Sequence, residues 1–309
     1  MSKLQFVSIT SSDKLLLPGL VYTPEQSTKQ AAIWLHGMGD TGTFYSPPRI
    51  NALGNSFTSK NIALLAFNNR GAHNAKTLRI DDESLPEDQR HYQGGTYFEK
   101  IADCVHDIDG AVAFLHKQGF STLYLLGHST GANKICAYHA RAKHNPFSKY
   151  VLASPGDDSG EYYAQLGKKK FWQALERAKQ LIANNKPLHT MPLASGMHPF
   201  SAQAAFDILD PDGAYNTFPY YEETTERIGH KPLFEEYRTF DRPTMVIFGE
   251  QDEFIITPGG AARARDILKK YLPTKIQADS AFKLIKGADH SFHDHESEFA
   301  EKVASWLAK

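Results

Sequence analysis

An apolar run at residues 123–126 that passes directly into a Gly-x-Ser-x-Gly motif constrains this fold more than any other feature of the sequence. The motif occupies residues 127–131, reads Gly-His-Ser-Thr-Gly, and precedes a helical pattern. Glycines flank the central serine because a Cβ atom on either side would obstruct so tight a turn from strand to helix. Ser129 is therefore expected at the edge of a sheet and at a helix N-terminus, where free N–H groups favour negative charge. This position makes Ser129 a candidate nucleophile.

Apolar runs alternate with helical patterns over most of the chain. Residues 4–10 and 15–22 predict an opening β-hairpin. Continuous apolar runs bounded by turn residues indicate parallel strands covered on both faces, and they occupy residues 31–35, 62–67, 122–126, 149–153, 244–248 and 282–286. Apolar residues at helical spacing predict helices over 97–117, from the serine turn to about 143, over 259–271 and over 295–308. This alternation predicts an α/β fold with a mostly parallel twisted sheet flanked by helices.

Residues 156–242 interrupt this alternation. Within them, residues 171–185 show an amphipathic helical pattern, and the rest is irregular and rich in Pro, Tyr, Phe and His. Because a structureless loop of this length is rare in a compact domain, we expect an inserted helical cap over the carboxyl edge of the sheet. The core of the fold then comprises residues 1–155 and 243–309. A second long polar loop, residues 73–96, is also expected to border the site.

The loops after two later strands supply partners for the serine. A serine hydroxyl becomes a good nucleophile only when a base lies within hydrogen-bonding reach and an acid orients that base. Asp252 follows the strand predicted at 244–248, and His290 follows the one at 282–286, at the sheet edge where open-sheet sites form. The order Ser, Asp, His is the one expected for a serine on this type of turn, so we predict that His290 takes the proton of Ser129 and that Asp252 orients His290. The alternatives are Glu250 or Glu253 as the acid and His293 or His295 as the base.

A tetrahedral intermediate also needs hydrogen-bond donors for its oxyanion. The backbone N–H of Thr130, at the start of the helix, is expected to be one donor. The second is expected from the loop after the first buried parallel strand, where residues 36–39 read His-Gly-Met-Gly. We predict the Met38 N–H for this role, with the Gly39 N–H as the alternative.

Other polar residues have structural interpretations. His128 is expected to point away from the substrate side, and Arg70 is expected to brace the serine loop through hydrogen bonds rather than to contact substrate. Packed or solvated roles are expected for the cap histidines, which are His189, His198 and His230. No metal is expected, because no strand supplies a ligand to join the group His290, His293, His295, Asp289 and Asp294.

The bulk properties exclude several classes of function. The 309-residue chain carries a formal net charge of −1, which argues against a nucleic-acid partner held by bulk electrostatics. It contains no run of about 18 apolar residues that would span a membrane, and its first residues lack an apolar stretch of signal-peptide length. Cys104 and Cys136 fall within predicted helices and are expected to be free thiols in a reducing cytosol. We therefore expect a cytoplasmic protein, and the serine chemistry described above requires no cofactor.

These motifs resemble those of the α/β-hydrolase superfamily over nearly the whole chain. The resemblance rests on the serine turn at 127–131, the His-Gly loop at 36–37, Asp252 in Gly-Glu-Gln-Asp and His290 in Gly-Ala-Asp-His. It implies the α/β-hydrolase fold, with a cap inserted where residues 156–242 lie.

A narrower resemblance is to the DUF1749-like hydrolases, a branch that includes fungal siderophore esterases. It rests on the serine turn, on Phe-Asn-Asn-Arg-Gly at 67–71, on Gly-Gly at 94–95, and on the Asp-Cys and Asp-Ile pairs at 103–104 and 107–108. The Asp-x-Arg-Gly-His-Gly pattern usual in the superfamily is replaced by Asn-Asn-Arg-Gly-Ala-His at 68–73. This departure affects the expected geometry of that loop and leaves the triad unchanged.

Together, the motifs and the resemblance predict a serine hydrolase that cleaves a small-molecule carboxylic ester through an acyl-enzyme intermediate. An amidase or peptidase and an acyltransferase are the alternatives within enzymes, because the superfamily includes them with the same triad. A binding protein on a hydrolase scaffold is the alternative from another class. Aromatic residues of the cap are expected to shape a partly apolar pocket over Ser129.

Overall fold

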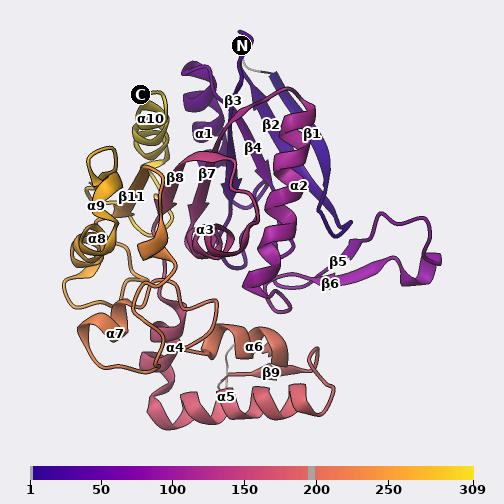
Figure 1. The fold of residues 1–309 in the computed structure, drawn as a ribbon, viewed down its shortest axis with the longest axis vertical. Coiled ribbons are helices and arrows are strands. Elements are labelled where there is room, and N and C mark those ends of the chain that lie inside the picture. The colour runs from indigo at the N-terminus through magenta and orange to yellow at the C-terminus, as the bar shows by residue number, and fades with distance from the viewer. Residues whose placement is uncertain (1–2, 194–198) are drawn as a thin grey trace.

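The computed structural model describes residues 3–193 and 199–309, and its centre is an eight-stranded sheet of order β1-β2-β4-β3-β7-β8-β11-β12 (Figure 1). β2 pairs antiparallel with both β1 and β4, whereas all the other neighbours are parallel. The sheet therefore confirms the predicted mostly parallel α/β fold and its opening hairpin. Its strands are β1 (Lys3–Thr10), β2 (Leu16–Thr23), β3 (Gln30–Leu35), β4 (Ala63–Phe67), β7 (Thr122–His128), β8 (Phe147–Ala153), β11 (Thr244–Gly249) and β12 (Ala281–Ile285).

Helices cover both faces of the sheet, as continuous apolar strands require. In β3, Ile33 packs in the apolar cluster that contains α2, α3 and α8, whereas its neighbour Trp34 packs in the cluster that contains α1 and α10. Successive side chains of a strand point to opposite faces, so this alternation separates the two layers of helices. The helices of the two layers are α1 (Pro47–Ser59), α2 (Cys104–Lys117), α3 (Thr130–Arg141), α8 (Gly260–Tyr271) and α10 (Glu296–Leu307). Shorter helical turns are η1 (Glu87–Gln89), η2 (Ile101–Asp103) and α9 (Thr274–Gln277).

The segment between β8 and β11 lies beyond the carboxyl end of β8, at the lower end of the molecule in Figure 1. α5 packs against α4 and α6, and its apolar face places Phe171 in the same buried cluster as the α2 and α3 side of the sheet. The elements of this segment are α4 (Asp158–Leu166), α5 (Lys168–Ala183), β9 (Thr190–Pro192), β10 (Pro199–Ser201), α6 (Ala202–Leu209), α7 (Tyr220–Thr224) and η3 (Tyr237–Thr239).

Two regions differ from what the sequence patterns predict. Residues 47–59 form helix α1, which buries Ile50, Leu53 and Phe57 at helical spacing although most of its other residues are polar or small. Residues 73–96, expected as a loop, contain the antiparallel hairpin of β5 (Lys76–Arg79) and β6 (His91–Gly94), which projects from the body of the molecule (Figure 1). Within the described residues, every helix is too short or too polar to cross a lipid bilayer.

Candidate active site

Ser129 lies at a strained turn between β7 and α3. Its backbone φ of 54° and ψ of −126° fall in a region that residues with side chains rarely adopt. A Cβ atom on Gly127 would collide with the carbonyl group of Gly131, and one on Gly131 would collide with the carbonyl group at the end of β3. The loop after β3 is equally close, because a Cβ atom on Gly37 would lie 2.9 Å from the Cβ atom of Ser129. Three glycines therefore allow the backbone to enclose the serine.

Asp252 and His290 meet at the same edge of the sheet. They follow β11 and β12, which are parallel neighbours, so both loops leave the sheet side by side. His290 Nδ1 lies 2.8 Å from Asp252 Oδ1, and both side chains are buried. This bond uses one ring nitrogen of His290 and leaves the other, Nε2, available for exchange of a proton with a reacting group.

The two alternative acids have other hydrogen-bond partners. Glu253 Oε2 accepts from the backbone N–H of His290 at 3.0 Å, and Glu250 Oε2 accepts from the backbone N–H of Gly287 at 3.0 Å. Both glutamates therefore hold the backbone of the histidine loop, whereas Asp252 bonds to the imidazole ring.

The two alternative bases lie outside the cavity described below. His293 Nδ1 lies 2.6 Å from Asp289 Oδ2 on an exposed part of the loop, and His295 Nδ1 lies 3.8 Å from a carboxylate oxygen of Glu298. Over the ranges 3–193 and 199–309, no group of three or more His, Cys, Asp or Glu side chains is arranged to hold a metal ion.

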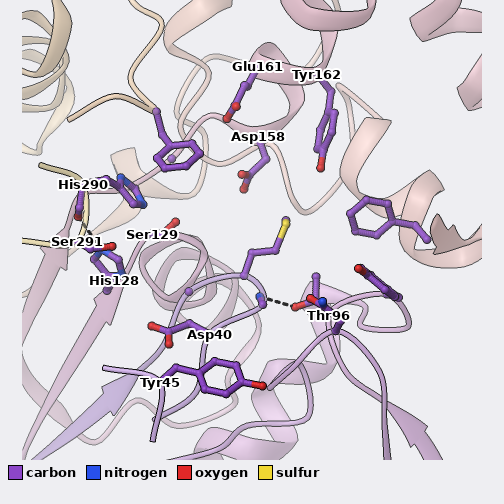
Figure 2. A pocket seen from close by; sticks show the side chains of 18 of the residues that line it. Asp40, Tyr45, Thr96, His128, Ser129, Asp158, Glu161, Tyr162, His290 and Ser291 are labelled. Carbon is purple, nitrogen blue, oxygen red and sulfur yellow. Dashed lines mark hydrogen bonds between the residues drawn. The ribbon is translucent and has the colours of Figure 1, made fainter. Parts of the chain in front are cut away.

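A cavity of about 630 Å³ opens over Ser129 and His290, and Figure 2 shows both side chains at its edge. Its walls come from the loop after β3, from α4 and from the loops after β11 and β12. The Ser129 hydroxyl makes no hydrogen bond with any residue that the structure describes. The bond between nucleophile and base is often long in a free enzyme and shortens only when substrate binds, so this geometry is compatible with proton transfer to His290.

The loop after β3 has one backbone donor already in use. The Gly39 N–H donates to Thr96 Oγ1 at 2.7 Å (Figure 2). The Thr96 hydroxyl in turn donates to the carbonyl oxygen of Gly71 at 2.9 Å. Of the two candidates in this loop, the Met38 N–H is therefore the one without an acceptor among the described residues. The Thr130 N–H, at the first position of α3, has no acceptor within the helix.

His128 has a closer relation to the cavity than the sequence predicts. Its Nε2–H donates to the carbonyl oxygen of His290 at 2.8 Å, and its ring stacks on Trp34 with the centroids 6.2 Å apart. Burial lowers the pKa of His128 well below its ordinary value, so the ring is neutral. His128 is also among the residues that line the cavity, while its ring packs against Trp34 and Phe292. Its bond to the backbone of His290 is nevertheless structural.

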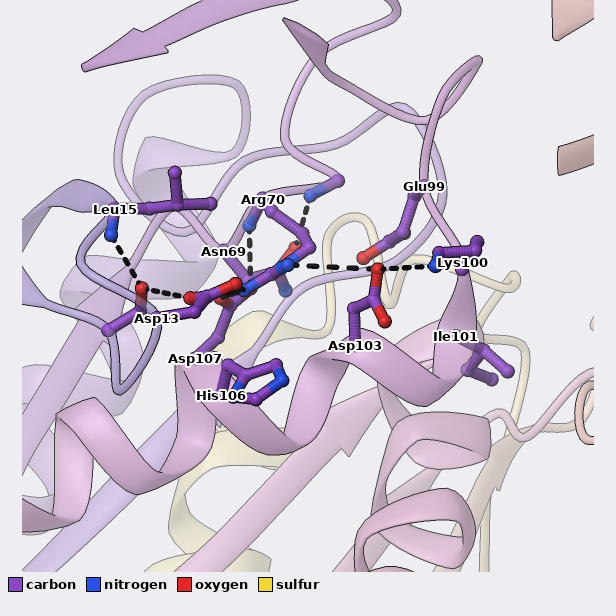
Figure 3. A network of polar contacts seen from close by, with 12 residues as sticks. Asp13, Leu15, Asn69, Arg70, Glu99, Lys100, Ile101, Asp103, His106 and Asp107 are labelled. Carbon is purple, nitrogen blue, oxygen red and sulfur yellow. Dashed lines mark hydrogen bonds and ion pairs between the residues drawn. The ribbon is translucent and has the colours of Figure 1, made fainter. Parts of the chain in front are cut away.

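Arg70 does not brace the serine loop as predicted. Its guanidinium group is buried and bonds to Asp107 of α2 at 2.8 Å and to Asp13 in the β1–β2 turn at 2.9 Å (Figure 3). These carboxylates raise the pKa of Arg70 although its burial acts in the opposite direction. The helix that follows the serine is held instead by Lys134, whose ammonium group donates to Asn69 Oδ1 at 3.1 Å. Arg70 is absent from the residues that line the cavity, in agreement with the expectation that it does not contact substrate.

Two carboxylates of α4 line the cavity and were not singled out from the sequence. Asp157 caps this helix by accepting the N–H of Gly160 at 2.9 Å, and the next turn directs Asp158 and Glu161 to the cavity (Figure 2). Burial raises the pKa of Asp158 to about 6 and that of Glu161 to about 7. The signal in the sequence is the Asp-Asp pair at 157–158, which follows β8 at the same sheet edge as Ser129.

The other residues singled out from the sequence lie away from the cavity wherever the structure describes them. His189 and His230 are exposed, and His198 lies outside the described residues. Cys104 and Cys136 are buried free thiols, and burial raises the pKa of both.

Comparison with known proteins gives one family and many similar folds. The family model described as serine aminopeptidase, S33, matches residues 26–298. No curated protein matches the sequence.

Three solved structures illustrate the shared fold. Est1E from Butyrivibrio proteoclasticus with bound ferulic acid has a TM-score of 0.60 at 15% identity, over 97% of this chain and 98% of that chain. The monoacylglycerol lipase of Paleococcus ferrophilus has a TM-score of 0.58 at 16% identity, over 99% of this chain and 98% of that chain. A soluble variant of monoglyceride lipase from Saccharomyces cerevisiae, in complex with a substrate analogue, has a TM-score of 0.59 at 15% identity, over 99% of this chain and 94% of that chain. At these identities the likeness is one of fold.

Proposed function

The chain is an α/β hydrolase of the serine aminopeptidase S33 family, and we propose that it hydrolyses small carboxylic esters with Ser129, His290 and Asp252 as its catalytic triad. The observation that carries this proposal is the 2.8 Å bond from His290 to Asp252 beside a serine held at the cavity edge in a strained turn. A buried acid, an imidazole and a hydroxyl that lines the cavity, in this order, are the requirements of nucleophilic acyl transfer.

In the first half of the reaction, Ser129 Oγ attacks the acyl carbon of the ester while His290 Nε2 takes the hydroxyl proton. Asp252 holds the imidazole in the tautomer with Nδ1 protonated and stabilises the imidazolium that forms. His290 then gives this proton to the alkoxide oxygen of the leaving group, and the acyl group remains on Ser129. In the second half, water attacks the acyl carbon while His290 takes a proton from the water. His290 then returns this proton to Ser129 Oγ as the bond between Oγ and the acyl carbon breaks, and the carboxylic acid leaves.

We assign the oxyanion donors to the backbone N–H groups of Met38 and Thr130. Support comes from the Gly39 N–H, whose bond to Thr96 keeps the loop in place and removes the alternative donor. Support also comes from Gly37, because its contact with Ser129 brings the neighbouring Met38 N–H to the nucleophile. Loss of one such donor typically costs about 3–4 kcal/mol of transition-state stabilisation.

The segment 156–242 would act as the cap of this site, and its α4 contributes Asp158, Glu161 and Tyr162 to the cavity wall. We further assign the chain to the DUF1749-like branch, with support from the Phe-Asn-Asn-Arg-Gly motif at 67–71 and the serine turn at 127–131. An ester is favoured as substrate because two proteins of similar fold are a monoacylglycerol lipase and a monoglyceride lipase. An amide is the second candidate, because the description of the matching family names an aminopeptidase.

The test compares matched substrates on wild-type protein and on Ser129→Ala. We expect hydrolysis of p-nitrophenyl butyrate and little hydrolysis of the corresponding p-nitroanilide, with kcat on the ester decreased on the order of 10⁶-fold in Ser129→Ala. A preference for the anilide would select the amidase alternative, and wild-type turnover of the ester by Ser129→Ala would eliminate the proposed triad.

A further inference from the structure

The carboxylates of Asp158 and Glu161, hereafter the carboxylate pair, face the cavity without a basic partner. Both side chains line the cavity, and Figure 2 shows them opposite Ser129. Asp158 Oδ2 is buried and has no hydrogen-bond partner. Among the described residues, Glu161 forms no ion pair. In the described lining of the cavity, no lysine or arginine occurs to neutralise the pair.

Asp40, the third carboxylate of the cavity, differs from the carboxylate pair because it has an arginine partner. Asp40 also lines the cavity, but its Oδ2 lies 2.5 Å from the guanidinium group of the buried Arg49. Removing a charge from water is costly unless an opposite charge compensates it, and Asp40 has this compensation within the protein. The carboxylate pair has no lysine or arginine partner, although Tyr215 hydrogen-bonds to Asp158 and His290 attracts both charges. The two carboxylates also repel each other, which contributes to the raised pKa of Glu161.

A purely structural role does not account for this arrangement. Acidic residues in the first turn of a helix stabilise the helix dipole, and Asp158 and Glu161 both lie in the first turn of α4, but this effect does not require either carboxylate to face the cavity. Asp157 already caps α4 through the N–H of Gly160. Partial burial of two further carboxyl groups beside a candidate nucleophile costs stability at neutral pH, and such costs are typical of residues that serve a ligand.

The aromatic residues of the same cavity also suit a cation. Tyr97 and Phe200 pack edge to face with ring centroids 5.6 Å apart, and Tyr162 joins them with its ring centroid 6.3 Å from that of Phe200. All three line the cavity, and Tyr162 lies beside Glu161 on α4. Aromatic faces attract ammonium groups, most strongly where water is excluded, and they attract carboxylates poorly.

We propose that the cavity selects an ester that carries a positively charged ammonium group, for which Asp158 and Glu161 are the counter-ions and the aromatic residues are the surrounding wall. This inference rests on the proposed function, since it names the substrate class of the same site. It makes the carboxylate pair determinants of specificity, while bond cleavage remains the task of Ser129 and His290.

Two pairs of esters that differ in charge and match in shape test the proposal. Butyrylcholine is compared with 3,3-dimethylbutyl butyrate, which places the charge on the alcohol side. Methyl 6-aminohexanoate is compared with methyl heptanoate, which places it on the acyl side. Hydrolysis is followed by titration of the released acid at constant pH.

In at least one pair, the wild-type protein should show a kcat/KM for the cationic ester that is about tenfold or more above that for its neutral partner. Glu161→Gln and Asp158→Asn should each reduce this ratio toward one. Glu176→Gln is the matched control, because it removes an exposed carboxylate of α5 that lies away from the cavity, and it should retain the wild-type ratio. Equal kcat/KM values within both pairs for the wild-type protein would overturn the inference and leave the proposed function intact.

Binding measured without turnover separates the two proposals. Calorimetric titration of Ser129→Ala with each ester should give tighter binding of a cationic ester than of its neutral partner, and Glu161→Gln in the same background should remove the difference. This result supports the inference even if the wild-type protein hydrolyses no ester, in which case the proposed function alone fails. Equal affinities within both pairs would refute the inference by a route independent of catalysis.

Discussion

Replacement of Gly37 by alanine tests the close contact between residues 36–39, the predicted oxyanion loop, and the nucleophile. The added Cβ atom would lie 2.9 Å from the Cβ atom of Ser129 and 3.5 Å from its Oγ. Carbon atoms in contact normally lie about 3.5–4.0 Å apart, so the loop and the serine must separate by about 0.6–1 Å. Oxyanion donors act only over about 2.7–3.1 Å, and a displacement of this size removes most of the contribution of the Met38 N–H. We expect kcat to decrease about 100–1000-fold, with a smaller effect on KM.

Steady-state hydrolysis of p-nitrophenyl butyrate measures this effect, and thermal unfolding checks that the variant is folded. Gly156→Ala is the matched control. Gly156 lines the same cavity, but its added Cβ atom would have Asp158 Oδ1 as its nearest neighbour, at an ordinary contact distance of 3.8 Å. The control should keep kcat within about threefold of wild type. A folded Gly37→Ala protein that also stays within this range would refute the assignment of the loop.

Three further variants test other parts of the account. Thr96→Val removes the acceptor of the Gly39 N–H, so kcat should decrease about tenfold while the unfolding midpoint changes little, and an unchanged kcat would contradict the role of this bond. The pKa of Asp158 is raised from its ordinary value near 3.8 to about 6. The folded protein therefore binds this proton more tightly than the unfolded chain does, so the free energy of unfolding falls as the pH rises through this range. Asp158→Asn should therefore raise Tm by about 2–4 °C at pH 8 and change it little at pH 3.5, whereas a lower Tm at pH 8 would show that the carboxylate is compensated. Arg70→Ala leaves Asp107 buried without its partner and should lower the free energy of unfolding by about 3–5 kcal/mol in urea titration, and a loss below about 1 kcal/mol would contradict the assigned pairing.

The sheet and the order of its elements were predictable because continuous apolar strands and glycine-rich turns are local signals. Ser129 and its two glycines form one local motif, so its place at a strand-to-helix turn follows from a few adjacent residues. Asp252 and His290 were candidates because each follows an apolar strand, and parallel neighbouring strands bring their carboxyl ends to one edge.

Contacts between distant segments were not predictable from these patterns. The choice between Met38 and Gly39 depends on Thr96, a residue 57 positions away in the sequence from Gly39. The partners of Arg70 likewise lie in the β1–β2 turn and on α2, and no local pattern connects these segments. Asp158 faces the cavity only because α4 packs over the sheet edge, and its sequence context is that of an ordinary helix start.

Helix α1 and the β5–β6 hairpin were missed for a related reason. The three buried residues of α1 stand among polar and small neighbours, so its apolar periodicity is weak over a short window. The hairpin projects from the body and buries little surface, and its strands therefore lack the alternation on which strand prediction depends.

Covalent labelling with a fluorophosphonate tests the central claim most directly, since this reagent reacts with a serine only where a neighbouring base and oxyanion donors activate it. Intact-mass measurement should show one added phosphonyl group per chain, and mass spectrometry of the digested protein should place it on Ser129. The label should be lost in Ser129→Ala and strongly reduced in a variant with His290 replaced by alanine. A wild-type protein that stays unlabelled, or that carries the label on another residue, would contradict the account.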